Sequence, residues 1–321
     1  MAFHSANIDR QLRFPGRLIR IFLGSFTPFK VKVYGLFLKA FHLLRPMGMR
    51  KESKWISSID GAKFRICIYR PKKSIEEQLP GILWIHGGGY VIGTPEQDHS
   101  YIKRFMQVQN CIVISPDYRL AGKAPFPAAL EDCYAALKWM KSCSQELGIR
   151  SDQLFVGGTS AGGGLTAALA LYARDRGEVS IAYQMPLYPM IDDRMTNPSA
   201  VGNRAPVWDS ASNALGWKAY LGDAYGTDRI SPYAAAARAT DFSNLPPACT
   251  FVGTVEPFFD ETVQYVHALS QAGVTVFFRQ FEGCYHAFDR MAPHSQKAKQ
   301  AVAFLLECYQ YAVHHFFAPQ P

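Results

Sequence analysis

The sequence lacks a long apolar run, a low-complexity tract and any cysteine pattern typical of zinc or disulfide frameworks. Its 321 residues contain seven cysteines, an odd number, with no CxxC or Cys/His cluster. A reduced, cytoplasmic protein is therefore expected. The apolar stretch near residues 18–26 is too short to cross a bilayer and the first residues are polar, so neither a membrane span nor a signal peptide is predicted.

Several chemical motifs are absent as well. The chain has no GxxxxGK[ST], no HExxH and no nucleic-acid-binding motif, so we expect no cofactor, no metal and no nucleic-acid partner. What remains is a globular composition, with 48% hydrophobic and 19% charged residues. That composition and length suit one large α/β domain with insertions.

The net charge of +8 is concentrated near the start of the chain. Residues 1–54 hold eleven Lys and Arg against two Asp and Glu, whereas the rest holds 23 against 24. Two interpretations stay open. The favoured one is a mobile helical segment with a basic, solvated face; the other is weak contact between residues 1–54 and an anionic membrane surface.

The order of strand and helix signals divides the chain into four segments. Residues 1–54 are expected to form an N-terminal segment with two short amphipathic helices, around 17–26 and 31–44, the second ended by Pro46 and Gly48. Residues 55–191 are expected to be the first part of an α/β core, 192–245 an insertion, and 246–321 the second part of the core.

Within the two core segments, strand and helix patterns alternate. Strands are predicted at 63–71, 81–86, 111–117, 153–158, 180–188, 247–253 and 274–281, and helices at 128–141, 160–175, 258–272 and 295–314. Continuous apolar runs such as GILWIH are typical of buried parallel strands. The alternation predicts a mostly parallel sheet with helices on both faces.

The sharpest motif is the GxSxG of residues 158–162, which directly follows an apolar strand and directly precedes a helix. A serine in such a turn is pushed out above the sheet, and flanking glycines are needed because a Cβ would clash there. GxSxG alone is a common chance match, but this context favours Ser160 as a nucleophile.

A second motif, His86-Gly87-Gly88-Gly89, follows the strand GILWI. Consecutive glycines let backbone N–H groups approach a ligand closely, as an oxyanion hole requires. The alternative is a flexible turn. We interpret His86 as a structural residue that holds this loop.

A base and an acid are expected after later strands, in the chain order Ser, acid, His. His286 lies in a Gly-containing loop after the last strand and is the predicted base. Glu256 is the first acidic residue after the preceding strand, so it is preferred over Asp260. Asp260 is expected to hold the loop or to cap the following helix.

Over residues 80–290 the chain resembles the hormone-sensitive-lipase-like family of carboxylesterases. The resemblance rests on HGGGYVIG, DYRLA…PFPAALEDC, GTSAGG, LPPACTFVGTVEPFFDE and YHAF. It implies an α/β-hydrolase with an eight-stranded sheet, a catalytic core of residues 55–191 and 246–321, and a helical cap built from residues 1–54 and the insertion 192–245. It also implies oxyanion N–H donors from Gly87, Gly88 and Ala161. Thr159 and Glu256 replace the commoner aspartates, so the chain is similar to the GTSAGG branch with a glutamate acid. The segment GKAPFP also departs from the usual family form.

The resemblance implies a serine carboxylesterase that hydrolyses small, apolar, short-chain acyl esters through an acyl-enzyme. The alternatives are a deacetylase, amidase or lipase of the same fold, or a catalytically silent binding protein. Four aromatic residues are candidates for the pocket lining, although ordinary cap core is favoured for each: Phe26, Phe37, Phe41 and Trp208. Cys284, two residues before His286, predicts sensitivity to thiol reagents. The resemblance also implies a homodimer, in which the edge strand at 274–281 pairs with that of a second copy.

Overall fold

A computed structural model describes residues 7–43, 46–73 and 77–321 of the chain. Eight strands form one sheet in the order β1-β2-β4-β3-β5-β6-β7-β8. The strands are β1 (Met49–Ser57), β2 (Lys63–Pro71), β3 (Leu79–Ile85), β4 (Ile112–Asp117), β5 (Ile149–Thr159), β6 (Tyr183–Leu187), β7 (Ala248–Gly253) and β8 (Val276–Phe281). Only the pairings of β1 with β2 and of β2 with β4 are antiparallel. The predicted mostly parallel eight-stranded sheet is confirmed.

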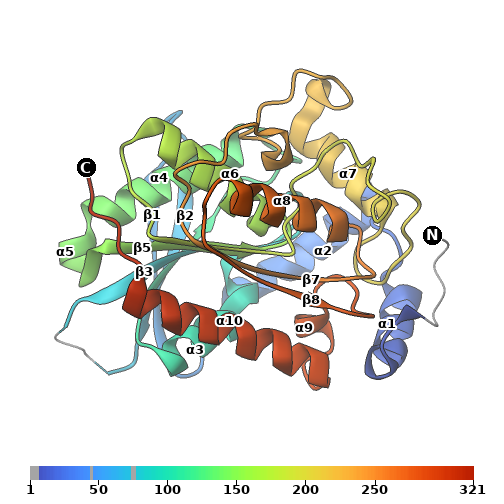
Figure 1. Cartoon of the computed structure of the whole chain (residues 1–321), viewed down its shortest axis with the longest axis horizontal. Helices are drawn as coiled ribbons and strands as arrows, with labels where there is room; N and C mark the ends of the chain where they lie inside the picture. The colour runs from blue at the N-terminus through green and yellow to red at the C-terminus, as the bar shows by residue number, and fades with distance from the viewer. Residues whose placement is uncertain (1–6, 44–45, 74–76) are drawn as a thin grey trace.

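Helices cover both faces of the sheet (Figure 1). They are α1 (Arg10–Phe22), α2 (Pro28–Lys39), α3 (His99–Val108), α4 (Ala128–Ser142), α5 (Ser144–Leu147), α6 (Ala161–Arg176), α7 (Ser210–Leu221), α8 (Phe259–Gln271), α9 (Phe288–Met291) and α10 (Gln296–His315). In Figure 1, α4, α6 and α8 lie above the sheet, and α3 and α10 lie below it. In the described ranges, none of these helices is both long and apolar enough to cross a membrane.

The central strands are buried on both faces because both are covered. Every residue of β3 is buried between β4 and β5, and β7 is buried along its whole length. This burial explains the continuous apolar runs from which these strands were predicted.

The start of the chain corrects three sequence predictions. Helix α1 begins at Arg10, where the Asp9 side chain accepts the Gln11 N–H, earlier than the predicted 17–26. Helix α2 ends at Lys39, and the remainder of the pattern to 43 is a 3-10 turn; Leu44, the last position of that pattern, lies outside the described residues. Farther along the chain, helix α3 was also not predicted.

Strand β1 is the third correction, because it begins at Met49, inside the segment predicted to be a helical cap. It pairs with β2 along its whole length. Met49 is its only buried residue, since β1 is an edge strand of the sheet. An exposed edge strand lacks the alternation of apolar and polar residues from which strands are predicted, so β1 could not be predicted from the sequence.

The insertion between β6 and β7 meets the N-terminal helices. The Ser25 hydroxyl donates to the Asp209 carboxylate at 2.5 Å, and the Phe26 N–H donates to the Ser212 hydroxyl at 2.9 Å. The rings of Phe26 and Trp208 lie 5.4 Å apart. Two segments almost two hundred residues apart in sequence therefore pack into one layer over the sheet.

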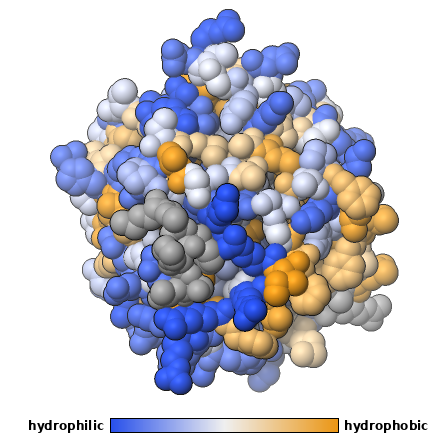
Figure 2. All heavy atoms as spheres, turned by 90° about the vertical axis from the view of Figure 1, so that its right-hand side faces the viewer, coloured by the Kyte–Doolittle hydropathy of each residue, from blue (hydrophilic) through white to orange (hydrophobic). Residues whose placement is uncertain are grey.

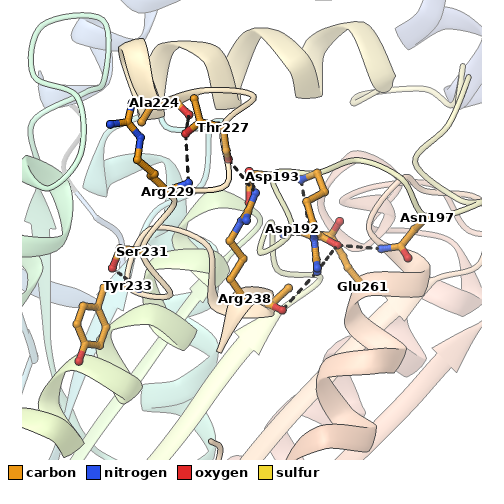
Figure 3. Close-up of polar contacts among 12 residues, drawn as sticks. Asp192, Asp193, Asn197, Ala224, Thr227, Arg229, Ser231, Tyr233, Arg238 and Glu261 are labelled. Atoms are coloured by element: carbon orange, nitrogen blue, oxygen red, sulfur yellow. Dashed lines mark hydrogen bonds and ion pairs between the residues drawn. The ribbon is translucent and has the colours of Figure 1, made fainter. Parts of the chain in front are cut away.

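Buried acidic residues anchor the base of the insertion (Figure 3). Arg238 pairs with Asp193 at 2.6 Å, and Arg194 pairs with Asp192 at 2.7 Å. On α8, the carboxylate of Glu261 accepts the Ile191 N–H at 2.8 Å. Burial raises the pKa of Glu261 well above its usual value, so the neutral carboxyl group is the form that this site favours.

We expect Glu261→Gln to keep the fold at neutral pH, because the amide oxygen can accept the same N–H. A carboxyl whose pKa is raised by folding stabilises the folded state at low pH, and that contribution is lost as pH rises towards its folded pKa. In a series measured from about pH 5 to pH 9, the stability of the wild type relative to Glu261→Gln should therefore fall as the pH rises until the folded-state pKa is passed, by at most about 1.4 kcal/mol per unit.

Urea unfolding across that pH range measures this difference. Glu307→Gln, which changes an exposed carboxylate on α10, is the matched control and should give a flat difference. A flat difference for Glu261→Gln as well would contradict the assignment.

Candidate active site

Ser160 occupies a sharp turn between β5 and α6. Its φ of 58° lies in the left-handed region, which a non-glycine residue adopts at a cost of about 1–3 kcal/mol. The turn is tight because a Cβ at Gly158 would lie 2.5 Å from the Ile85 carbonyl oxygen, and one at Gly162 would lie 2.1 Å from it. Only glycine fits at these two positions, so the sequence motif has a steric cause.

His286 lies between Ser160 and Glu256. Its Nε2 is 2.9 Å from the Ser160 Oγ, and its Nδ1 is 2.5 Å from a carboxylate oxygen of Glu256. The three residues are 7%, 3% and 0% exposed, in the order Ser160, His286 and Glu256. The structure thus brings together the three residues that the sequence singled out, from the ends of β5, β7 and β8.

Two aromatic rings fix the plane of the His286 imidazole. Tyr188 and Phe258 each meet it edge-on with ring centroids 5.0 Å away. Neither ring was predicted from the sequence to contact His286. Tyr188 is the last residue of the strand predicted at 180–188, at the carboxyl edge of the sheet, and that position was the available signal.

The Glu256 carboxylate is fully buried, and each of its two oxygens makes a hydrogen bond. One oxygen faces His286 and the other accepts the Gly253 N–H at 2.9 Å. Burial raises the pKa of Glu256, while His286 and the Gly253 N–H oppose that rise. The competing candidate, Asp260, instead accepts the Ser199 N–H at 2.7 Å, a contact with the insertion that was not predicted. Its place in the first turn of α8 agrees with the predicted favourable charge at that helix start.

The glycine turn after β3 passes beside the nucleophile. A Cβ at Gly87 would lie 3.3 Å from the Ser160 Cβ. Gly88 has a φ of 131°, and a Cβ there would lie 1.9 Å from the Ile92 carbonyl oxygen. Within the described ranges, the N–H groups of Gly87, Gly88 and Ala161 have no hydrogen-bond acceptor, which leaves them available to a bound oxygen.

His86 supports this turn from below. It is fully buried and stacks on Tyr118 with ring centroids 4.2 Å apart, and its Nδ1 lies 2.9 Å from the Gly87 carbonyl oxygen. Burial lowers its pKa, which favours the neutral imidazole. The prediction that His86 holds the loop agrees with these contacts.

Comparison with known proteins identifies the family. A family model described as alpha/beta hydrolase fold matches residues 82–290. The esterase LipI of Mycobacterium tuberculosis is 33% identical over 69% of this chain and 69% of its own length. The chain belongs to the hormone-sensitive-lipase-like family of α/β-hydrolases.

Two further relatives of this family cover more of the chain. The ethyl acetate hydrolase of Pseudomonas putida is 30% identical over 79% of this chain and 80% of its own length. The solved structure of a bacterial heroin esterase superposes with a TM-score of 0.86 at 31% identity, covering 96% of this chain and 99% of that one. The hydrolase fold therefore extends across nearly the whole chain.

Two further expectations about single residues are wrong. Cys284 is fully buried and burial raises the pKa of its thiol, so it lacks the exposed thiolate that makes a cysteine reactive. Phe37 is 62% exposed, so it belongs neither to the cap core nor to a buried pocket lining.

We expect Gly88→Ala to lower kcat/KM by about 10²–10³-fold, because the new methyl group forces the turn away from the Ile92 carbonyl and misplaces an N–H donor. Gly122→Ala is the matched control, since nothing lies within 4 Å of a Cβ at that position, and its activity should match the wild type. Ester hydrolysis measured for both variants, with circular dichroism to verify folding, makes the comparison. A fully active Gly88→Ala would contradict the role of this turn.

Proposed function

We propose that this protein is a serine carboxylesterase that hydrolyses short-chain acyl esters through an acyl-enzyme on Ser160. The observation that carries the proposal is the buried chain of contacts from the Ser160 Oγ through His286 to Glu256. It lies beside a glycine turn with unused N–H groups. The relatives named esterase and ethyl acetate hydrolase support the same reaction.

In the first step His286 takes the proton of the Ser160 hydroxyl as the oxygen attacks the ester carbonyl. The carbonyl π electrons move to oxygen, and the resulting oxyanion accepts hydrogen bonds from the N–H groups of Gly87, Gly88 and Ala161. His286 then gives its proton to the leaving alcohol. In the second step His286 takes a proton from a water molecule as its oxygen attacks the acyl carbonyl. The intermediate then collapses, the bond between the acyl carbon and the Ser160 Oγ breaks, and His286 returns the proton to Ser160 as the carboxylic acid leaves.

Glu256 has two tasks in this mechanism. Its contact with Nδ1 holds His286 in the tautomer that presents an unprotonated Nε2 to serine, and its charge stabilises the imidazolium that forms. Because burial raises the pKa of Glu256, its ionised form must be stabilised by neighbouring groups. The Gly253 N–H and the imidazolium favour its ionised form.

Two observations support a preference for short acyl chains: the crowding around the glycine turn and the name of one relative. A Cβ at Gly89 would lie 2.1 Å from the Trp208 ring, and Trp208 is itself buried. This ring narrows the space beside the glycine turn. The relative named ethyl acetate hydrolase is consistent with a small acyl group.

We also propose a homodimer through the edge of the sheet. Strand β8 is the last strand in the sheet order, and most of its residues are partly or fully exposed. An unpaired edge of this kind can pair with a second copy of itself. Light scattering that gives the mass of a monomer at working concentration would contradict this proposal.

Ser160→Ala should abolish hydrolysis, with kcat lowered by about 10⁴–10⁶-fold, because no other group can form the acyl-enzyme. The measurement is hydrolysis of p-nitrophenyl esters from acetate to palmitate by both proteins. For the wild type, rates should be highest on the short esters. Equal rates for the two proteins would contradict the role of Ser160.

Glu256→Gln should lower kcat by about 10²–10⁴-fold, because an amide cannot stabilise the imidazolium and permits the wrong tautomer. Asp260→Asn is the control for the competing acid and should cost less than about tenfold, since it changes only a loop contact. The same ester assay separates the two variants. A larger loss in Asp260→Asn than in Glu256→Gln would reverse the assignment.

A further inference from the structure

Helix α1 packs against the loop that carries the proposed base. Gly16 of α1 packs against Tyr285, since a Cβ at Gly16 would lie 2.9 Å from that ring. The Asp9 N–H donates to the Gly283 carbonyl at 2.9 Å. These contacts join α1 to the loop that carries His286.

The turn between α1 and α2 reaches the other side of the site. Phe26 lies against Trp208, and Trp208 lies against Gly89 of the glycine turn. Leu12 and Gly16 form the buried face of α1. Val31, Tyr34 and Leu38 of α2 pack against the main core. Both helices are therefore docked through one face only.

The opposite faces of both helices are apolar and exposed. Eight residues make up this outer face: Phe14, Leu18, Ile21 and Phe22 on α1, and Phe29, Val33, Leu36 and Phe37 on α2. Each is between 39% and 76% exposed. The spacing within each helix is the same, i, i+4, i+7 and i+8, which places the four side chains on one side of the helix.

Exposed apolar residues on protein surfaces are usually scattered singly, whereas a gathered set marks a contact site. Figure 2 views the molecule from the side that bears α1, and there apolar residues gather from the lower middle to the right-hand edge, next to strongly hydrophilic ones. A trough of about 810 Å³ along α1 is lined by Phe14 and Ile21 together with Arg17.

The charged residues within α1 and α2 are all basic. Arg10, Arg17 and Lys32 are exposed on the same two helices, and the only acidic residues among residues 1–54 are Asp9 and Glu52. A helix with exposed Phe, Leu and Ile bordered by Arg and Lys is suited to lie in the interface of an anionic membrane. A second copy of the same face would bring like charges together, which disfavours that occupant.

We propose that the outer face of α1 and α2 docks this protein on an anionic lipid membrane and holds the site beside esters dissolved in the bilayer. The membrane role deepens the proposed function and rests on it, since α1 contacts the loop of His286 and Phe26, between the two helices, contacts Trp208 beside the glycine turn. The apolar side chains enter the boundary between headgroups and acyl chains, and the basic ones pair with lipid phosphates. Binding therefore needs both contributions.

The test is co-sedimentation of the full chain with vesicles of phosphatidylcholine containing about 30 mol% phosphatidylglycerol, and with vesicles of phosphatidylcholine alone. The wild type should bind the anionic vesicles at low salt, and binding should weaken at about 0.5 M salt. Point substitutions are used rather than truncation, because removing α1 would also remove contacts that hold the His286 loop.

Two variants separate the apolar and charged contributions. Phe22→Ser with Phe37→Ser should weaken partitioning about tenfold or more, because two exposed rings no longer enter the interface. Arg10→Glu with Arg17→Glu should weaken binding to anionic vesicles to a similar extent. The weaker binding to neutral vesicles should be the same as for the wild type. Trp55→Ser is the matched control, because it removes an exposed aromatic ring from β1, outside both helices.

Hydrolysis of p-nitrophenyl acetate without vesicles should be the same in all these variants, since none of the changed side chains contacts the site. No binding by the wild type at low salt, or equal binding by all variants, would overturn the membrane proposal. Dimerisation that the outer-face variants abolish, without vesicle binding, would assign the face to a second copy and overturn it too. A wild type that binds vesicles but hydrolyses no ester would instead contradict the proposed function.

Discussion

The packing of the β5–α6 turn against the end of β3 sets the positions of most of the site. Gly158 and Gly162 both lie so close to the Ile85 carbonyl that neither can carry a side chain. This contact holds Ser160 in its left-handed conformation and brings Gly87 beside it. The strain at one residue is thus held by the whole parallel sheet, because the strands that converge there are buried on both faces.

The buried acid and base add an electrostatic requirement to this geometry. A carboxylate as enclosed as that of Glu256 is costly unless hydrogen bonds and a cation favour its ionised form. Here the Gly253 N–H contacts one oxygen and His286 the other. Tyr188 and Phe258 hold the imidazole edge-on, so His286 can face serine without a further polar contact.

The cap layer is tied to the same elements that carry the site. Glu261 on α8, five residues after Glu256, bonds the backbone at the start of the insertion, and α1 bonds the loop of His286. A change in the position of either cap segment would therefore reach the base or its acid. This connection gives the exposed outer face of α1 and α2 a physical route to the site.

The sequence by itself determined the parallel core, the nucleophile turn and the glycine turn, because buried strands and glycine-only positions impose a residue type at each place. It also ranked Glu256 above Asp260, since the first acidic residue after a strand lies nearer the sheet edge than one on the following helix. Only the tertiary structure decided the rest. Strand β1 has one buried residue and so carried no apolar signal. The positions of Tyr188 beside His286 and of Trp208 beside Gly89 depend on packing between segments that are distant in sequence. The apolar spacing of α2 was visible in the sequence, but a periodic pattern does not say whether that face meets the core or the solvent.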